Sequence, residues 1–549
     1  MKLHFLLGLL LTTSLSLVQA QEMDKTPNNW PHLDLQADGI LGMSTDKAYA
    51  DLLAGKKGET VVVAVIDSGM DIEHEDLADV MWVNEDEIPG NGKDDDNNGY
   101  VDDVHGWNFI GGPDGSHVNG ENLEIVRLYN RYKARFEGAD KSKLSKAARR
   151  EYEKYEEYKE IIEKKREDLA PKLMVYASTK EAIDALVEAI GKEPADIGLA
   201  EVEKFKDDEG EAGKAASIML RFLNEGSSFE EIYEEIKGAF EYFDQSYNMN
   251  WNPDFDARHI VGDDPSDLDD RDYGNNDVEG PDAVHGTHVG GIIGAIRNNG
   301  IGMDGVAGQV RLMSIRTVPN GDERDKDVAN AIRYAVDNGA SIINMSFGKG
   351  QSPYKEAVDD AVRYAVANDV LLIHAAGNDA KENTEDNNFP HDRYAKRGFF
   401  GPKYAATWIE VGAMTASNDE NLTASFSNWS PERVDIFAPG AEIYATVPGD
   451  KYRMLQGTSM AAPMVAGLAA ILRSYFPDLT AKQVKGIIMD SSYRPTQLVK
   501  EPGGERKVPL NRLCVTGGVA NTYNAVQLAK STKGKKKRAP ERDPSLKAY

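Results

Sequence analysis

Ser459 is the side chain in this sequence best placed to act as a nucleophile. It lies in the run Gly-Thr-Ser-Met-Ala-Ala-Pro at residues 457–463, where small neighbours leave room for a substrate carbonyl. Apolar residues recur through residues 465–472 at the spacing of a buried helix that begins near the serine. The free N–H groups of such a helix start favour a developing negative charge. A helix cap is the commoner role for this serine, so a nucleophile also requires a base and an orienting acid.

A histidine and an aspartate in suitable surroundings occur upstream. The apolar run at residues 61–66 ends in Asp67, which predicts a buried parallel strand with a carboxylate at its C-terminal end. His285 opens the run His-Gly-Thr-His-Val, the start of a second helix of small residues. Together the three side chains can perform acyl transfer, because the imidazole takes the serine proton and the carboxylate orients and stabilises the imidazolium.

The order Asp67, His285, Ser459 closely resembles the subtilisin-like serine peptidases. The motifs Val-Ile-Asp-Ser-Gly, His-Gly-Thr-His-Val and Gly-Thr-Ser-Met-Ala-Ala-Pro each match the family pattern, and the resemblance covers about residues 29–528 with one large insert. It implies a serine endopeptidase that cleaves proteins or peptides through an acyl-enzyme. The family pattern places the base at the first histidine, so His288 is expected to be a structural neighbour. Asn378 matches the family's oxyanion donor, although an isolated asparagine is more often a turn residue.

The same resemblance assigns the substrate-binding segments. A substrate would add as a strand along one of them and place the side chain before the scissile bond between both. The residues are Ser346, Phe347 and Gly348 on one wall and Ala375, Ala376 and Gly377 on the other. Their small size predicts a pocket open to apolar side chains.

Two other functions use the same fold. A non-catalytic binding or scaffold protein is disfavoured because no member of the triad is missing. An acyl transferase or esterase would use the same residues, and product analysis with an added amine nucleophile separates it from a hydrolase.

Oxygen-bearing side chains alternate in the loop at residues 91–103, with a glycine at the turn. Hard oxygen ligands in this arrangement are typical of a calcium loop. The loop differs from an EF-hand because His105 stands where the last glutamate would be. We expect a structural calcium ion, with a metal-free acidic turn as the alternative. The expected ligands are Asp94, Asp96, Asn98, Tyr100, Asp102 and Asp103.

The elements that must position these residues follow an α/β pattern. Strand-like and helix-like runs alternate between residues 310 and 376, which predicts a subtilisin-like parallel sheet with helices on both faces. Residues 21–112 and 250–528 would form this discontinuous peptidase domain. Residues 113–249, called the insert below, show long helical periodicities and predict an α-helical subdomain whose first long stretch is broken at Pro171. Residues 529–549 predict a basic, disordered tail.

Composition restricts the cellular compartment and the binding partners that we expect for this protein. The chain has 549 residues and a formal net charge of −28, which argues against nucleic acid as a partner. Residues 1–20 resemble a signal peptide whose apolar run is too short to span a membrane, so we expect export to the periplasm or beyond. Cys514 is the single cysteine, which excludes an intramolecular disulfide and makes calcium a natural stabiliser.

Two expectations concern the organisation of the chain. Few residues separate the signal peptide from the peptidase pattern, so the separate prodomain common in the family is expected to be missing. The insert enters between Asp67 and His285, which must meet in space, so its ends should return close together near the active-site edge. It could be a surface decoration, roof the cleft, or give the folding help of a prodomain.

Overall fold

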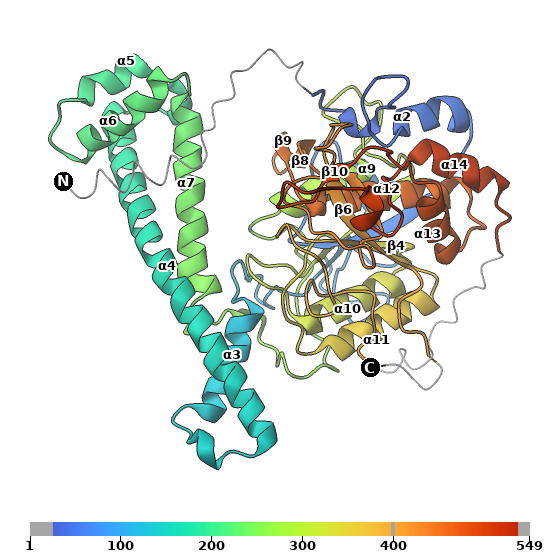
Figure 1. The fold of residues 1–549 in the computed structure, drawn as a ribbon, viewed down its shortest axis with the longest axis horizontal. Helices are drawn as coiled ribbons and strands as arrows, with labels where there is room; N and C mark the ends of the chain where they lie inside the picture. The colour runs from blue at the N-terminus through green and yellow to red at the C-terminus, as the bar shows by residue number, and fades with distance from the viewer. Residues whose placement is uncertain (1–25, 397–400, 536–549) are drawn as a thin grey trace.

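The computed structural model describes residues 26–396 and 401–535, and its centre is a seven-stranded sheet (Figure 1). The strand order is β2-β3-β1-β4-β5-β6-β7, and every pairing is parallel. The strands are β1 (Val61–Asp67), β2 (Gly106–Asn108), β3 (Val310–Arg316), β4 (Ile342–Met345), β5 (Leu371–Ala375), β6 (Trp408–Met414) and β7 (Ile436–Pro439).

Both faces of the sheet are buried, which explains why its strands are almost continuously apolar. Along β1, Val63 and Val65 join one hydrophobic core, whereas Ala64 and Ile66 join the other. The first core is covered by α9 (Val284–Gly294), α12 (Thr458–Tyr475), α13 (Ala481–Asp490) and α14 (Thr522–Ser531). The second is covered by α10 (Asp325–Asp337) and α11 (Lys355–Ala367). The predicted α/β sheet with helices on both faces is confirmed.

Short elements complete this α/β body. They are α2 (Thr45–Ala48), α8 (Arg258–Val261) and the antiparallel pairs β8 (Ile443–Val447) with β9 (Lys451–Leu455) and β10 (Val499–Lys500) with β11 (Lys507–Val508). Helix α14 continues to Ser531 and buries Ala529, so the start predicted for the tail lies inside a helix that packs on the core. The predicted signal peptide and residues 536–549 lie outside the described residues. Within the described part, no helix combines the length and the apolar character needed to cross a membrane.

The insert contains the helices α3 (Glu124–Phe136), α4 (Lys146–Ile190), α5 (Leu199–Val202), α6 (Glu211–Asn224) and α7 (Phe229–Gln245). Figure 1 shows them as an arm to the side of the α/β body, with α3 along one half of α4 and α6 and α7 along the other. Each half has its own hydrophobic core.

Pro171 does not break this arm, contrary to the sequence prediction. It lies inside α4, which is continuous for 45 residues. A proline in a helix interior costs about 3 kcal/mol, because one hydrogen bond is lost and the ring meets the preceding turn. Packing on both sides of the proline offsets that cost: Ile162 lies in the core shared with α3, and Leu186 lies in the core shared with α6 and α7.

The two ends of the insert lie side by side on the α/β body. The Asn122 amide donates to the carbonyl oxygens of Met249 at 2.8 Å and Asn252 at 3.0 Å. The Leu123 N–H donates to the carbonyl oxygen of Asn250 at 3.1 Å. The chain therefore leaves the α/β body and returns to it at one place.

Candidate active site

Asp67, His285 and Ser459 all lie at the carboxyl edge of the sheet. Asp67 is the last residue of β1, and His285 and Ser459 are the second residues of α9 and α12. Sites in parallel α/β sheets form at this edge, because strand ends and helix starts meet there. Helix α9 approaches the loop after β1 so closely that a Cβ on Gly286 would lie 2.0 Å from the Gly69 carbonyl oxygen.

The structure brings Asp67 and His285 into direct contact. Nδ1 of His285 lies 2.7 Å from Oδ1 of Asp67, which also accepts the Ser68 N–H at 2.8 Å. Burial disfavours the imidazolium, but the charge and the hydrogen bond of Asp67 outweigh it and raise the pKa of His285. Asp67 thus fixes the ring and favours its protonated form.

The hydroxyl of Ser459 is bound to the segment that follows β4. Its Oγ donates to the main-chain oxygen of Ser346 at 3.0 Å, and Ser346 Oγ donates to the main-chain oxygen of Ser459 at 2.9 Å. A hydroxyl has one proton to donate, so transfer to His285 requires Ser459 to leave this hydrogen bond. Hydrogen bonds of catalytic groups commonly tighten only when substrate is bound.

Asn378 lies against the first turn of α12. Its Oδ1 accepts the Thr458 N–H at 2.8 Å and the Thr458 hydroxyl at 3.0 Å. A Cβ on Gly457 would lie 3.3 Å from Asn378 Nδ2 and 3.6 Å from the Ser459 nitrogen. Two N–H donors therefore border the space that the absent side chain of Gly457 leaves open, which suits a developing oxyanion.

His288 lies apart from this chemistry. Its Nε2 is 3.1 Å from the carbonyl oxygens of both Ile443 and Arg453, so the ring joins α9 to the β8–β9 hairpin. Burial is the main cause that lowers the pKa of His288 to about 4. A neutral, buried ring of this kind fits the structural role expected from the sequence.

The two segments predicted as pocket walls both contact the start of α12, because Ser346 exchanges hydrogen bonds with Ser459 and the Gly377 N–H donates to the Thr458 hydroxyl. The structure adds one residue that the sequence did not single out. Ser346, Phe347 and Gly348 follow β4, whereas Ala375, Ala376 and Gly377 end β5 and follow it. Asn388 Oδ1 lies 2.7 Å from where a Cβ of Gly348 would be and 3.1 Å from that of Gly377. The Asn388 amide therefore lies between the two walls.

A buried carboxylate fixes that amide. Asn388 Nδ2 donates to Glu410 Oε1 at 2.8 Å and to the Ala375 carbonyl at 3.1 Å, so Oδ1 faces the walls. Glu410 also binds the fully buried His374, 3.0 Å from its Nδ1, and the Trp408 indole at 2.9 Å. The sequence offered only one signal for this cluster, polar residues within two strands that are otherwise apolar.

The calcium ligands predicted in the loop at residues 91–103, called the acidic loop below, fall into two groups in the structure. Oxygens of Asp96, Asp103 and Glu87 lie within 4.8 Å of one another, and the Asn98 amide donates to both aspartates. The other three predicted residues serve the loop or the core. Asp94 and Asp102 accept main-chain N–H groups, and the Tyr100 ring packs on Trp107, Phe109 and Tyr334. Glu87 was missed because it precedes the loop in the sequence.

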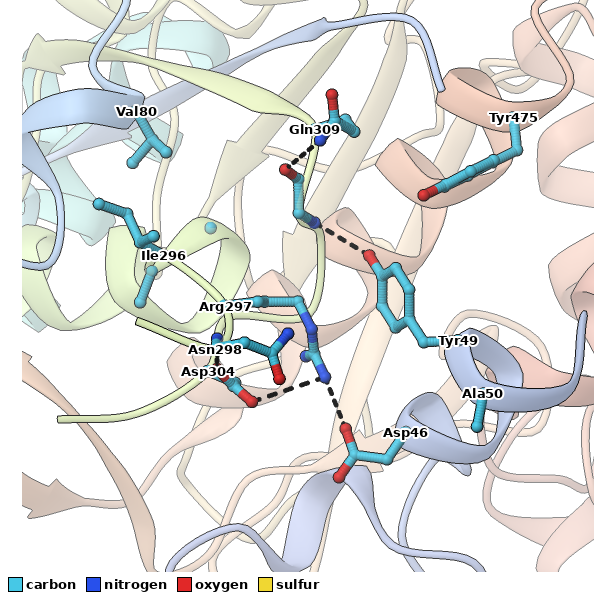
Figure 2. A pocket seen from close by; sticks show the side chains of 13 residues that line it. Asp46, Tyr49, Ala50, Val80, Ile296, Arg297, Asn298, Asp304, Gln309 and Tyr475 are labelled. Carbon is cyan, nitrogen blue, oxygen red and sulfur yellow. Dashed lines mark hydrogen bonds and ion pairs between the residues drawn. The ribbon is translucent and has the colours of Figure 1, made fainter. Parts of the chain in front are cut away.

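A cavity of about 620 Å³ lies far from these residues, at the opposite ends of α9 and α12 (Figure 2). Arg297 crosses it, with Nη2 2.6 Å from Asp46 Oδ1 and its guanidinium 4.5 Å from the centre of the Tyr49 ring. The Tyr49 hydroxyl in turn accepts the Gly308 N–H at 2.9 Å. The described residues that line this cavity include no serine, cysteine or histidine, so they offer no second pair of nucleophile and base.

A doubly covered parallel sheet with a serine, a histidine and an aspartate at its carboxyl edge defines an α/β protein equipped for acyl-transfer chemistry. Residues 58–513 match the family model described as the Subtilase family. The chain therefore belongs to the subtilase family.

Curated relatives match the α/β body in part. The chain is 37% identical to the "Thermophilic serine proteinase" of Bacillus sp. (strain AK1) over 224 residues, 41% of this chain and 49% of the relative. It is 38% identical to the "Major intracellular serine protease" of Bacillus subtilis (strain 168) over 210 residues, 38% of this chain and 60% of the relative. The matches thus span about half of the length of these relatives, both of which are named as serine proteases.

Proposed function

We propose that this protein is an exported serine endopeptidase that hydrolyses peptide bonds through an acyl-enzyme. The observation that carries the proposal is the contact of Asp67 Oδ1 with His285 Nδ1 at 2.7 Å, at the edge where Ser459 is the second residue of α12. Asn378 binds the preceding residue, Thr458. The family and the names of its relatives support proteolysis in general. The assignment of each catalytic role is supported by the family motifs around these residues together with the contacts described above.

In this mechanism the substrate adds as a strand along residues 346–348. Its arrival frees the Ser459 hydroxyl from the Ser346 carbonyl, and His285 accepts the proton as Ser459 attacks the scissile carbonyl. Asp67 stabilises the imidazolium that forms. The Ser459 N–H and the Asn378 amide stabilise the oxyanion. His285 then protonates the leaving amine, and water hydrolyses the ester by the same steps in reverse order.

We further propose that the acidic loop binds a structural calcium ion through Glu87, Asp96 and Asp103. Asp96 and Asp103 lie in the loop and Glu87 precedes it, and within the described residues no lysine or arginine pairs with any of the three carboxylates. Hard oxygen ligands without a cationic partner suit Ca²⁺. The ion would stabilise the fold rather than take part in the chemical step.

The test is hydrolysis of an unstructured protein at neutral pH by the wild-type chain and by Ser459→Ala. We expect the wild type to cleave it, a serine-directed inhibitor to block cleavage, and Ser459→Ala to remain folded without measurable turnover. Turnover near the wild-type rate in Ser459→Ala would refute the nucleophile. Products joined to an added amine, in place of free acids, would show an acyl transferase instead.

A further inference from the structure

Lys349 is a buried charge directly next to the predicted substrate-binding segment. It follows Gly348, and its side chain is only 1% exposed. Its Nζ lies 3.0 Å from Glu124 Oε2, 2.9 Å from Asp325 Oδ1 and 2.6 Å from the Glu323 carbonyl oxygen. A lysine this deeply buried requires such partners, and one of them, Glu124, belongs to the insert.

The main chain of Lys349 joins the two sides of the pocket. Its N–H donates to the Phe389 carbonyl at 3.0 Å, and its carbonyl accepts the Phe389 N–H at 2.9 Å. Phe389 follows Asn388, whose amide oxygen lies between Gly348 and Gly377. A displacement of Lys349 would therefore move both the substrate-binding segment and the residue between the walls.

Glu124 is itself held firmly at the base of the insert. It is the first residue of α3, and its N–H donates to Asp322 Oδ2 at 2.7 Å. Its carboxylate accepts from Arg127 Nη2 at 2.6 Å, and Arg127 also donates to the carbonyl oxygens of Asp322 and Glu323. The start of α3 is thus bound to the loop before α10, and this contact brings Glu124 to Lys349.

Both members of the pair stay charged across the neutral range. Burial would raise the pKa of Glu124, but Lys349 and Arg127 together lower it to about 2. Burial would likewise lower the pKa of Lys349, but Asp325 and Glu124 raise it above its ordinary value. The attraction between them is therefore constant over the pH range in which His285 titrates.

We propose that Lys349 is a positioning residue through which the insert sets the geometry of the substrate-binding segment. This proposal rests on the proposed peptidase function. Ser346 is bound to Ser459, and the segment runs away from the scissile bond toward Lys349. Substrates with several residues before the scissile bond would reach the part that Lys349 holds, whereas a single-residue substrate would not. The insert is then part of the extended substrate site.

The experiment compares Glu124→Gln and Lys349→Met with the wild type on two substrates. One is a single-residue amide, and the other is a tetrapeptide amide with the same residue at the cleaved bond. Lys159→Met is the matched control, because Lys159 pairs with Glu163 on the exposed surface of α4. We expect both site variants to raise KM for the tetrapeptide by about tenfold with kcat changed less than about twofold, the signature of lost uniform binding.

Kinetics on the single-residue amide should stay at the wild-type level in the control variant, and in the two site variants they should change less than the kinetics on the tetrapeptide. Glu124→Gln keeps the size of the side chain, so it serves if Lys349→Met fails to fold. A lowered melting temperature with unchanged tetrapeptide KM would show a merely structural anchor and overturn the proposal. Equal losses on both substrates would also overturn it. A wild-type chain that cleaves neither substrate would instead refute the proposed function, and this proposal with it.

Discussion

Ser459 and Ser346 exchange hydrogen bonds, because the hydroxyl of each donates to the main-chain oxygen of the other, at 3.0 Å and 2.9 Å. The candidate nucleophile and the segment expected to bind substrate are thus aligned as one unit. In this arrangement the Ser459 hydroxyl is directed to a carbonyl that an incoming substrate strand would approach. The proposed mechanism therefore links substrate binding to release of the Ser459 hydroxyl.

Replacement of Asn378 by leucine should reduce kcat by about 10²–10³-fold with little change in KM, because one of two oxyanion donors is lost. The same change removes the acceptor of the Thr458 N–H, so the free energy of unfolding should also fall by about 1 kcal/mol. Steady-state kinetics well below the melting temperature separate the two effects. Asn387→Leu, in the same connection between β5 and β6, is the control, and equal kinetic effects in both variants would contradict the oxyanion role.

The pH dependence of kcat/KM should show an acid limb above pH 6.5, the ordinary pKa of histidine, because Asp67 raises the pKa of His285 and only the neutral ring accepts a proton. Asp67→Asn should move this limb to lower pH and reduce kcat by about 10⁴-fold, as in serine triads generally. If the limb stays at the same pH in Asp67→Asn, it reports the titration of a group other than His285.

The contact between Asp67 and His285 should also contribute to the free energy of unfolding. This contribution should fall as the pH rises, whereas kcat/KM should rise. A raised pKa means that the folded state binds the His285 proton more tightly than the unfolded state does. Its contribution is fully present below pH 6.5 and is lost as the pH rises through the folded pKa. The measurement compares the free energy of unfolding as a function of pH in Ser459→Ala and in the double variant Ser459→Ala/Asp67→Asn. The Ser459→Ala background avoids self-cleavage. The same pH dependence in both chains would refute the prediction.

Calcium removal should lower the melting temperature of the Ser459→Ala chain. At free calcium of about 100 times the dissociation constant, the expected stabilisation is about 2.7 kcal/mol. Asp96→Asn and Asp103→Asn should weaken the response, whereas Asp360→Asn on the exposed surface of α11 should leave it intact. An identical melting temperature in chelator and in millimolar calcium would contradict the proposed ion.

Asn388 should influence which residue precedes the cleaved bond. Its amide oxygen faces the space between Gly348 and Gly377, while its nitrogen is bound to Glu410 and Ala375. An acceptor in this place favours side chains that donate a hydrogen bond, which refines the apolar pocket expected from the sequence. Cleavage-site profiling of a peptide mixture should therefore shift toward apolar residues in Asn388→Leu. An unchanged profile would place Asn388 outside the pocket.

The sequence predicted the sheet and the meeting of Asp67 and His285, because each lies in a short contiguous motif at the end of one element. Lys349 and Glu410 could not be found in this way. A charged residue in a sequence indicates exposure, and the partners that bury Lys349 are 24 residues upstream at Asp325 and 225 residues upstream at Glu124. The prediction that Pro171 breaks the helix was wrong for a related reason. The packing of α4 on its neighbours outweighs the low helix propensity of proline.

The side-by-side ends of the insert have a consequence for chain integrity. A single cut between α5 and α6 would leave β1 and β2 on one fragment and the other five strands of the sheet on the second. Because β1 pairs with both β3 and β4, the smaller fragment would remain hydrogen-bonded in the middle of the sheet. Asp67 would then belong to one polypeptide and His285 and Ser459 to another. The order of the strands, rather than an unbroken backbone, holds the site together.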